Sequence, residues 1–595
     1  MDKKATIGYI LIFVIIFITF YINQQNVSEI EKEKTKRDTL VTDNKIKNNN
    51  QASDSLSNNQ FADTTNTQKQ TDTIPEKIYT ISNSKLKIDI SNKGAKIKEA
   101  KLVEFKTFYR KPLSLLKNNS DSLNFKIYTT EGILNTMNLT YKPISISNNK
   151  VSLEAQTKSG KVIINYELKN NSYKLNTELI LKNFEKNILP NQNYIDMKWI
   201  SNIVLAEQSI EDERSKTTVY FKFTTENDVD YLSETKNDDK ELQKGVHWVC
   251  YKQKFFNTTL INKNGFSDKS KIDVEVPAFE DSNSIKKLTS SFILPYNFNS
   301  NEKYTFEMYI GPNKYDILSK QGIDLEDIIS LGFFAWVNKI MIIPIFTMLE
   351  KNFVNMGFVI LLLTLIIKLI LFPLVYKSYV SSAKMKILKP EIDEIKNKYG
   401  NDMTKIQQEN MKLYKRAGVS PFGGCLPMLI QLPILLAMFN FFPASIELRQ
   451  KAFLWAKDLS TYDPILEFGF HIPGYGSHVS LFTLLMTIST LLYTRMNNQL
   501  TGVSGQMKWI SYLMPILFLG FFNNYASGLT YYYFLANMIT FGQNVVIRRF
   551  FVDEKKLHKQ IEENKKKPVV MKKSSFQKKL EEMQKKNNTR MKNKK

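Results

Sequence analysis

Cysteine and histidine are scarce in this chain. Its 595 residues include only Cys250, Cys425 and four histidines, two of which (His471 and His478) lie in one short segment. Two cysteines exclude a disulfide-stapled scaffold and a multi-cysteine metal site. Four histidines leave little room for histidine-based catalysis. We therefore expect no catalytic residue, no metal and no cofactor, and we interpret the chain as a non-enzyme.

Charge is almost absent from several long stretches near the two ends. Such runs occupy residues 5–27, 356–375, 422–442, 479–493, 509–525 and 529–547. About 20 apolar residues cross the hydrocarbon core of a bilayer as a helix, so we predict six transmembrane helices. Several runs are shorter, which implies a locally thinned bilayer or flanking side chains that snorkel.

The first run follows the basic start Met-Asp-Lys-Lys, as in a signal sequence. It ends without a small-x-small cleavage site, and no cysteine follows for lipid attachment. We interpret residues 1–27 as an uncleaved transmembrane signal anchor. A cleaved signal peptide is the alternative.

The net charge of +24 is concentrated in two segments. Residues 377–420 carry 10 basic and 5 acidic residues, and residues 548–595 carry 18 and 6. Basic segments beside spans stay in the cytoplasm. We predict a multi-pass membrane protein with both termini cytoplasmic and the hydrophilic region after the first span on the outer side.

Residues 331–350 are apolar, but Asn338, Lys339 and Pro344 interrupt them. If they formed a seventh span, residues 377–420 would fall on the outer side. We predict instead an amphipathic helix that lies along the outer membrane interface, within residues 321–352.

The outer region has two parts of different composition. Residues 28–75 are rich in Asn, Ser, Thr and Lys and cannot bury enough apolar surface to fold, so we predict a disordered tether. From 76 to 320, apolar and polar residues alternate with period two, for example in 85–90, 161–168 and 304–310. This alternation predicts an all-β sandwich domain. The predicted fold class is a polytopic α-helical membrane protein, with a five-helix core at 353–547 and an inserted all-β domain.

The predicted cytoplasmic parts are a hairpin and a tail. In residues 377–420 an apolar heptad stripe comprises Met385, Leu388, Ile392, Ile395 and Tyr399. Pro390 interrupts or restarts the first arm. We predict a helical hairpin, either a rigid connector or a docking arm for a soluble partner. The lysine-dense tail 548–595 either binds ribosomal RNA or anionic lipid headgroups or only fixes topology.

Lys368 is the one charge inside the six runs, about 10 Å from the end of its run. A charge at that depth costs at least about 2.5–3.5 kcal/mol. The runs contain no Asp or Glu, so an ion pair within them is excluded. They do contain neutral polar residues that we expect to line a hydrated groove with Lys368: Thr364, one turn away, and Gln431, Asn537, Gln543 and Asn544.

Such a groove would lower the barrier that a polar chain segment meets in lipid. Three alternatives remain for Lys368. It snorkels to the cytoplasmic interface, it is neutral through desolvation, or it belongs to an ion pathway.

Motifs across nearly the whole chain resemble the YidC family of membrane protein insertases. In the core these are SAKM at 382–385, LKP at 388–390, LYK at 413–415, SPFGGCLPMLIQLPI at 420–434, ELR at 447–449, AFLW at 452–455, DLS at 458–460, MP at 514–515 and SGLTYYY at 527–533. WVCYKQKFF at 248–256 and YIGP at 309–312 are similar to the periplasmic domain of its Gram-negative members.

The resemblance implies a β-sandwich periplasmic domain and a five-helix insertase core with a groove open to cytoplasm and lipid. It implies insertion and folding of nascent membrane proteins in the cell inner membrane, alone or with the Sec translocon. The family's groove cation falls on Lys368, and its substrate-contacting aromatics fall on Tyr532 and Tyr533. The hairpin 377–420 and the tail are implied to contact the ribosome and signal-recognition components.

One residue departs from the family pattern, because the groove cation is commonly Arg. Lysine lacks the bidentate fork of arginine, which suggests that the groove needs a point charge. Two other functions are considered: a small-solute or ion transporter built around Lys368, and an envelope scaffold that its spans only anchor. A transporter would be supported by inverted repeats and carboxylates in the spans, and the sequence shows neither.

Overall fold

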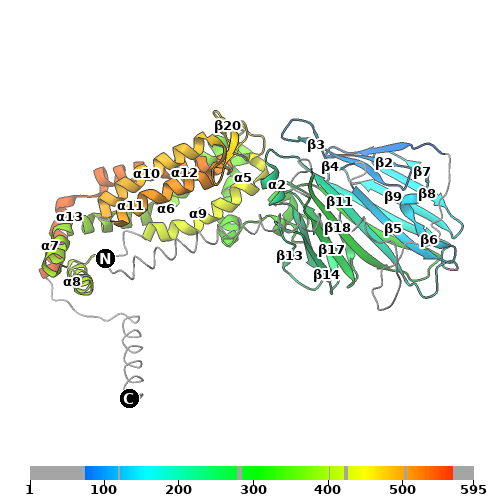
Figure 1. Cartoon of the computed structure of the whole chain (residues 1–595), viewed down its shortest axis with the longest axis horizontal. Coiled ribbons are helices and arrows are strands. Elements are labelled where there is room, and N and C mark those ends of the chain that lie inside the picture. The colour runs from blue at the N-terminus through cyan, green and yellow to red at the C-terminus, as the bar shows by residue number, and fades with distance from the viewer. Residues whose placement is uncertain are drawn as a thin grey trace, which may run out of the picture.

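The computed structural model describes residues 74–117, 121–277, 284–400, 402–420, 426–501 and 506–566. Figure 1 shows an elongated molecule with β-sheets at one end and helices at the other. The predicted signal anchor 1–27, nearly all of the predicted tether and residues 567–595 of the predicted tail lie outside the described residues.

Three antiparallel sheets form the β region. Across the largest, the order is β13 (Val229–Tyr231), β12 (Thr218–Phe223), β15 (Val246–Lys252), β16 (Phe256–Phe266), β19 (Asn301–Pro312), β10 (Lys174–Lys182), β9 (Lys161–Leu168), β8 (Lys150–Gln156) and β7 (Lys142–Ile146). The second contains β14 (Asp238–Leu242), β17 (Ser270–Glu275), β18 (Ser284–Pro295), β11 (Tyr194–Val204), β5 (Asp121–Thr129) and β6 (Gly132–Asn135). The third contains β1 (Ile78–Ser82), β2 (Leu86–Ser91), β3 (Ile97–Lys106) and β4 (Pro112–Leu116).

The two larger sheets pack face to face as a sandwich. Trp199 of β11 stacks on Tyr251 of β15 with ring centroids 3.6 Å apart, and the Tyr251 hydroxyl donates to the Trp199 carbonyl at 2.9 Å. The predicted alternation places the core side chains: in β10, Leu175, Leu179 and Leu181 are buried, and the residues that alternate with them are partly exposed. The prediction of an all-β sandwich is confirmed.

A broken helical segment connects the sandwich to the long helices. It comprises α3 (Tyr315–Ser319), η2 (Leu325–Ile328), α4 (Ala335–Val337), the π-helical turn η3 (Asn338–Ile342) and α5 (Ile343–Asn352). The predicted single helix over 331–350 is therefore interrupted. Asn338 is fully buried, and its amide donates to the carbonyls of Leu331 and Ala437 at 3.2 and 3.1 Å. The polar residue that interrupts the sequence pattern thus holds this segment against the next helices.

Five helices form the body of the helical end. They are α6 (Met356–Ile387), α9 (Leu426–Ala444), α10 (Leu481–Thr501), α11 (Gln506–Asn523) and α12 (Ser527–Val546). Each overlaps one of the predicted apolar runs. Among the described residues, α6 alone combines the length and the hydropathy of a membrane crossing, and the part of α9 from Gln431 to Ala444 is a shorter apolar helix. The count of six spans stays a prediction.

The end of the helices far from the sheets carries a small helical cluster (Figure 1). The predicted hairpin arms are α7 (Lys389–Tyr399), with Pro390 in its first turn, and α8 (Met403–Ala417). The chain leaves α12 through the π-helical turn η5 (Ile547–Phe551) into α13 (Glu554–Lys566). Ile561 of α13 packs with Leu388 and Ala417, and the Lys565 amine pairs with the Glu391 carboxylate at 2.6 Å.

The predicted basic tail therefore begins as an ordered helix that packs on the hairpin, which sequence reasoning missed. A two-stranded hairpin, β20 (Pro464–Ile472) and β21 (Gly476–Ser480), was also missed; it lies between α9 and α10.

Candidate functional site

The predicted site around Lys368 lies where α6, α9 and α12 meet. Asn355 caps the start of α6 by accepting from the Phe358 amide at 3.2 Å, and the apolar run that follows forms a continuous helix. Thr364 and Lys368 are four residues apart and so share one helix face. Both are buried, with Thr364 at 0% and Lys368 at 3% exposure. The one charge of the apolar run 356–375 therefore lies inside the helix cluster.

The Lys368 ammonium has a neutral partner. Its Nζ donates to Gln431 Oε1 of α9 at 3.4 Å, which is long for a bond from a charged donor, where about 2.7–2.9 Å is typical. Gln543 of α12 donates its Nε2 to the backbone carbonyl of Lys368 at 2.9 Å, and its Oε1 is buried with no partner among the described residues. The structure thus brings Lys368, Gln431 and Gln543 together.

Thr364 is close to Lys368 along α6, but its hydroxyl is already used. Thr364 Oγ1 donates to the Ile360 carbonyl at 2.6 Å, four residues earlier in the same helix. Its remaining capacity is as an acceptor. Thr364 therefore adds polarity to this face of α6 without a free donor.

The two predicted aromatic residues lie on α12 against α9. Tyr532 is 2% exposed, and its ring lies 5.6 Å from that of Phe442. The Tyr533 hydroxyl donates to the Leu435 carbonyl at 3.0 Å. Asn537, one turn further along α12, donates instead to Ser489 Oγ and Thr490 Oγ1 of α10 at 3.1 and 2.8 Å. Tyr533 and Gln431 thus meet α9, whereas Asn537 joins α12 to α10.

Around Lys368 these residues form a short series of polar groups among the otherwise apolar helices α6, α9 and α12. An ammonium carries three N–H donors, and one of those of Lys368 has a partner among the described residues. Residues 421–425 and the side chains of 426–430, which precede Gln431 in the chain, lie outside the described residues. The hydrated groove remains a prediction, and the geometry shows a buried cation with spare hydrogen-bonding capacity.

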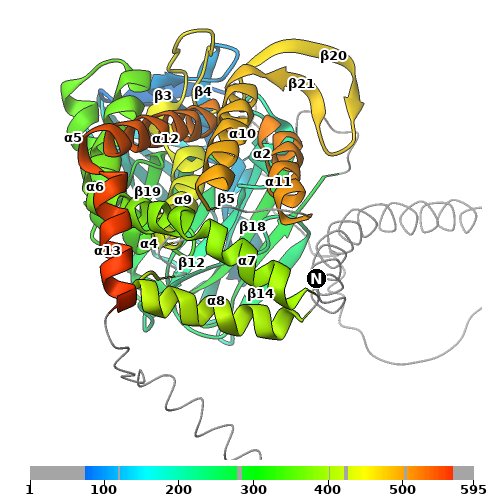
Figure 2. The ribbon, with the colours of Figure 1, turned by 90° about the vertical axis from the view of Figure 1, so that its left-hand side faces the viewer.

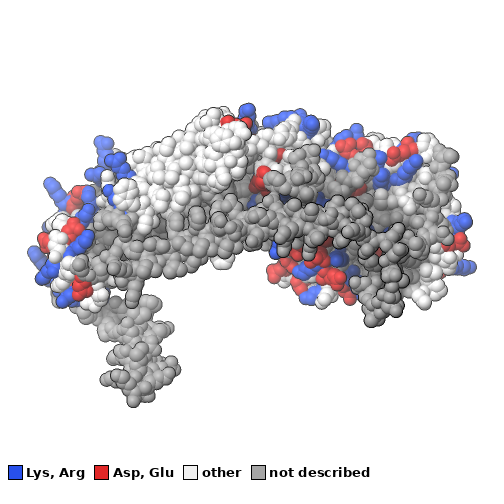
Figure 3. All heavy atoms as spheres, in the orientation of Figure 1, with Lys and Arg blue, Asp and Glu red and all other residues white. Residues whose placement is uncertain are grey.

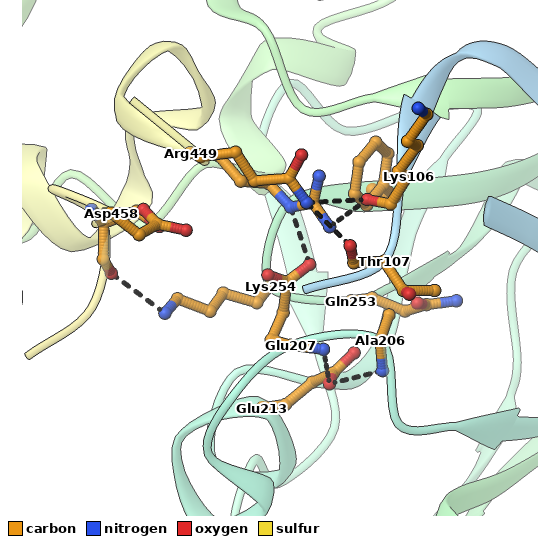
Figure 4. Close-up of polar contacts among 12 residues, drawn as sticks. Lys106, Thr107, Ala206, Glu207, Glu213, Gln253, Lys254, Arg449 and Asp458 are labelled. Atoms are coloured by element: carbon orange, nitrogen blue, oxygen red, sulfur yellow. Dashed lines mark hydrogen bonds and ion pairs between the residues drawn. The ribbon is translucent and has the colours of Figure 1, made fainter. Parts of the chain in front are cut away.

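A second polar cluster joins the sandwich to the helices (Figure 4). Arg449 follows η4 (Ile446–Leu448), between α9 and α10. Its Nε donates to Glu207 Oε1 at 2.8 Å, and its Nη2 donates to the Lys106 carbonyl at 2.6 Å. The side chains of Arg449 and Glu207 are only 3% and 6% exposed. Removing one partner of such a pair leaves a buried unpaired charge, which costs about 3–5 kcal/mol.

Lys254 makes a parallel connection between the same two regions. Its amine contacts Asp212 Oδ2 at 2.5 Å within the sandwich and donates to the Ser460 carbonyl of the helical region at 3.3 Å. Burial alone would lower the pKa of Lys254, but the Asp212 carboxylate outweighs it, and the pKa is raised. The ammonium therefore stays charged in this joint.

Glu213 lies beneath the joint, at the end of the short helix α2 (Ile210–Arg214), and is 1% exposed. Its Oε2 accepts from the backbone amides of Ala206 and Glu207 at 3.0 Å each. Burial, together with the nearby Glu207 charge, raises the pKa of Glu213 to about 7. Burial also raises the pKa of Glu207, against the opposing charge of Arg449. This joint therefore contains a carboxyl group, that of Glu213, which titrates near neutral pH.

A cavity of about 440 Å³ lies beside the joint. The sandwich lines it with Lys216, Lys252 and Lys254, and the helical region lines it with Phe439, Asn440 and Tyr525, among others. Among the described residues, no group of three or more His, Cys, Asp or Glu side chains is arranged to hold a metal ion.

Sequence reasoning identified the residues around Lys368 but missed the joint. Gln431 and Gln543 were visible as polar residues inside apolar runs. Glu207 and Arg449 are 242 positions apart, and a single sequence gives no sign that they form a pair. The one hint in the sequence was that Arg449 belongs to the ELR motif at 447–449, which is among the motifs that resemble the insertase family.

Two family models match the chain. The model described as "60Kd inner membrane protein" matches residues 348–556, and the model described as "YidC periplasmic domain" matches residues 78–344. Together they cover most of the chain, including both the joint and the surroundings of Lys368.

Two curated relatives match over almost their whole length. A membrane protein insertase YidC of Parabacteroides distasonis is 37% identical, with 94% of each chain covered. One of Amoebophilus asiaticus is 36% identical, again with 94% of each chain covered. Among solved structures, an active YidC insertase with its first transmembrane domain resolved is 19% identical, covering 81% of this chain and 94% of that chain with a TM-score of 0.33.

Proposed function

The chain belongs to the YidC family of membrane protein insertases, and we propose that it inserts nascent membrane proteins along the polar groups that α6, α9 and α12 bury between them. Family membership supports the activity, since relatives that match 94% of the chain are named insertases. The buried contact of Lys368 with Gln431 is the observation that supports the route. The matches to the two family models also support an inner-membrane protein with a periplasmic domain.

A polar interface inside apolar helices suits this task for a physical reason. A polar peptide segment that enters hydrocarbon loses its water, and each unsatisfied backbone group then costs several kcal/mol. Lys368 has donors to spare, and Gln543 Oε1 is an acceptor without a partner among the described residues. Backbone and side-chain groups of a client segment can form hydrogen bonds with these two residues, which lowers the free-energy barrier to crossing the hydrocarbon. A fixed positive charge also favours segments with acidic residues.

We further propose six spans, with both termini and the α7–α8 hairpin in the cytoplasm and the sandwich in the periplasm. The charge pattern of the sequence supports this topology. Figure 3 adds support, because on the face in view an uncharged surface separates the charged sheet end from the charged end that holds α7, α8 and α13. Within this topology, residues 1–27 are a signal anchor, 28–75 a tether, 76–320 the periplasmic domain, 321–352 an interfacial segment, 353–547 the five-helix core and 548–595 the tail.

The basic cytoplasmic surface supports a set of partners. The hairpin 377–420 and the tail carry most of the net charge of +24, which suits ribosomal RNA, signal-recognition components and anionic lipid headgroups. We propose that the chain works alone or beside the Sec translocon. No acidic residue lies on α6, α9, α10, α11 or α12, so a proton-coupled transporter has no carboxylate there.

Site-specific crosslinking to a stalled nascent chain tests the route. A photoreactive residue at Thr364, Gln431 or Tyr533 should crosslink to the first span of a client. The same probe at Leu369, which is 60% exposed on the outer surface of α6, should crosslink mainly to lipid. Equal client crosslinking at Leu369 and at the three buried positions would contradict the proposed route while leaving the insertase activity intact.

A further inference from the structure

The hairpin formed by β20 and β21 extends sideways from the helices. Figure 2, which looks along the long axis, shows it reaching out beyond α10 and α11. β21 ends at Ser480 and α10 begins at Leu481, so no linker separates the hairpin from the helix. In the proposed topology, which this inference rests on, that junction lies at the periplasmic surface of the bilayer. A hairpin that projects sideways there lies over lipid and not over the protein's own helices.

The base of this hairpin is firmly held. Asp463 accepts from the Phe482 amide at 2.9 Å and from the Trp455 indole at 2.7 Å. Asn523, at the end of α11, accepts from the Ser480 amide at 2.9 Å and donates to the His478 carbonyl at 2.6 Å. Both residues are buried. The direction in which the hairpin projects is therefore set by the ends of two helices.

The sequence of β20 alternates with a period of two from Leu466 to Ile472, although its pairing with β21 shifts register between Glu467 and Ile472. Its alternate residues Leu466, Phe468, Phe470 and Ile472 are all apolar. Leu466 is 56% exposed and Phe470 is 66% exposed, whereas Phe468 is half-buried beside Phe470 and Tyr475 of the same hairpin. Alternate side chains of a strand point to opposite faces, so an uncovered apolar face lies along the projecting hairpin.

The other face of β20 carries the polar residues of the strand beside the exposed Ile465, and it meets protein at His471. It carries Glu467 and His471, and His471 lines the cavity between the sandwich and the helices. Glu467 pairs in register with His478 of β21, whose ring stacks on Tyr462 at 3.8 Å. Since one face turns toward the joint with the sandwich, the face with Phe470 turns away from it.

We propose that the apolar face of β20 inserts into the outer leaflet of the membrane, at the boundary between headgroups and acyl chains. Phenylalanine and leucine are typical of interfacial segments that bury an apolar face at this depth. Glu467 is the only charged residue from 464 to 480, so little charge would have to leave water. The hairpin would thereby fix the height and tilt of the α10 end relative to the bilayer surface, beside the cavity that His471 lines.

Spin labels at single cysteines in the full-length protein test this proposal. The background is Cys250→Ala with Cys425→Ser, reconstituted in vesicles of phosphatidylethanolamine and phosphatidylglycerol. Labels at Leu466→Cys and Phe470→Cys should collide several-fold more with oxygen, which concentrates in acyl chains, than with a water-soluble nickel chelate. The opposite-face control Glu467→Cys should show the reverse preference.

A label at Leu492→Cys separates this inference from the proposed topology. Leu492 lies on α10 and is 53% exposed, so it should report lipid whenever α10 crosses the membrane. Lipid contact at Leu492 with nickel access at Phe470 would overturn the inference and leave the topology standing. Protection of Phe470 from both reagents would also overturn it, because protein and not lipid would then cover the face. Thermal melts of each labelled protein verify that it is folded.

Discussion

Two buried lysines, one in the sandwich and one in the helices, differ in how many hydrogen-bond partners their amines have. Lys286 of β18 is 0% exposed, and its amine donates to the carbonyls of Thr217 and Glu234 at 2.5 and 2.8 Å. Lys368 of α6 is 3% exposed, and its amine makes one long bond to Gln431. Burial lowers the pKa of Lys286 to about 8, although the Glu234 charge opposes this.

The difference distinguishes a lysine whose donors have partners within the fold from one to which we assign a role in the proposed insertion route. Lys286 donates to backbone carbonyls of two other segments of the sandwich, at Thr217 and Glu234, and so connects three segments of its chain. Lys368 retains donors that the described residues do not satisfy, and such a charge in an apolar helix is a candidate for function. The buried cations of the joint resemble Lys286 in having partners within the protein, because Arg449 and Lys254 each pair with a carboxylate.

The largest expected effect comes from removing the structural lysine. Lys286→Met leaves the carbonyls of Thr217 and Glu234 without a donor, and we expect it to lower the free energy of unfolding by about 3 kcal/mol. Thermal unfolding followed by the fluorescence of the buried Trp199 and Trp248 measures this. Lys287→Met is the matched control, because Lys287 is exposed and pairs only with Glu275. An equal effect of the two substitutions would show that Lys286 is not a structural anchor.

A second expected effect is that the stability of the protein depends on pH through Glu213, a residue of the sandwich region. Glu213 has a folded pKa of about 7 and an ordinary value of 4.5, so between these values the folded protein holds a proton that the unfolded chain has lost. The stability should therefore fall as pH rises from 5 to 8, by about 2 kcal/mol from this group. Glu213→Gln should remove most of this slope.

Unfolding midpoints at pH 5 and pH 8 measure it, and Glu211→Gln, at an exposed neighbour, should leave the slope unchanged. A slope that persists in Glu213→Gln would place the titration elsewhere, with Glu207 the first candidate, because its pKa is also raised.

If Lys368 acts in the proposed route, its substitution should affect insertion and not folding. Lys368→Glu reverses the charge among neutral partners, and we expect about tenfold slower insertion of a single-span client with an acidic outward tail, equivalent to about 1.4 kcal/mol of barrier. Lys368→Arg should insert at close to the normal rate. Insertion into proteoliposomes and complementation of an insertase-depleted strain measure both. Normal insertion by both Lys368→Glu and Lys368→Ala would remove Lys368 from the mechanism.

The smallest expected effect concerns the partner of Lys368. Gln431→Leu removes one acceptor, worth about 1 kcal/mol or less, and should slow insertion only a few-fold. Gln431→Glu should slow it more, because a carboxylate would pair with the ammonium and occupy its donors. The same insertion assay ranks the two variants. If Gln431→Glu inserts faster than Gln431→Leu, the free donors of Lys368 are not what the client uses.

Local patterns in the sequence were enough to predict the strands and the long helices. Period-two alternation in 161–168 and 304–310 became β9 and part of β19, and five apolar runs became the five long helices. These predictions succeed because side-chain periodicity is a property of neighbouring residues. The same logic identified Lys368 as exceptional, since its apolar neighbours are adjacent in sequence.

The features that were missed depend on contacts between distant residues or on short patterns. The Arg449–Glu207 pair links residues 242 positions apart, and Ile561 is buried only because it meets Leu388 and Ala417. In contrast, the alternation of Leu466, Phe468, Phe470 and Ile472 was present in the sequence and was overlooked between two longer apolar runs.

The packing of α13 beneath the hairpin has a mechanical consequence. Lys565 and Ile561 hold this helix against the α7–α8 pair, and Leu557 packs beside Tyr379 of α6. A force applied to α13 would therefore be transmitted through these packed side chains to α6, the helix that carries Lys368. A partner that bound next to α13 would then act mechanically on α6, the helix that carries the buried Lys368.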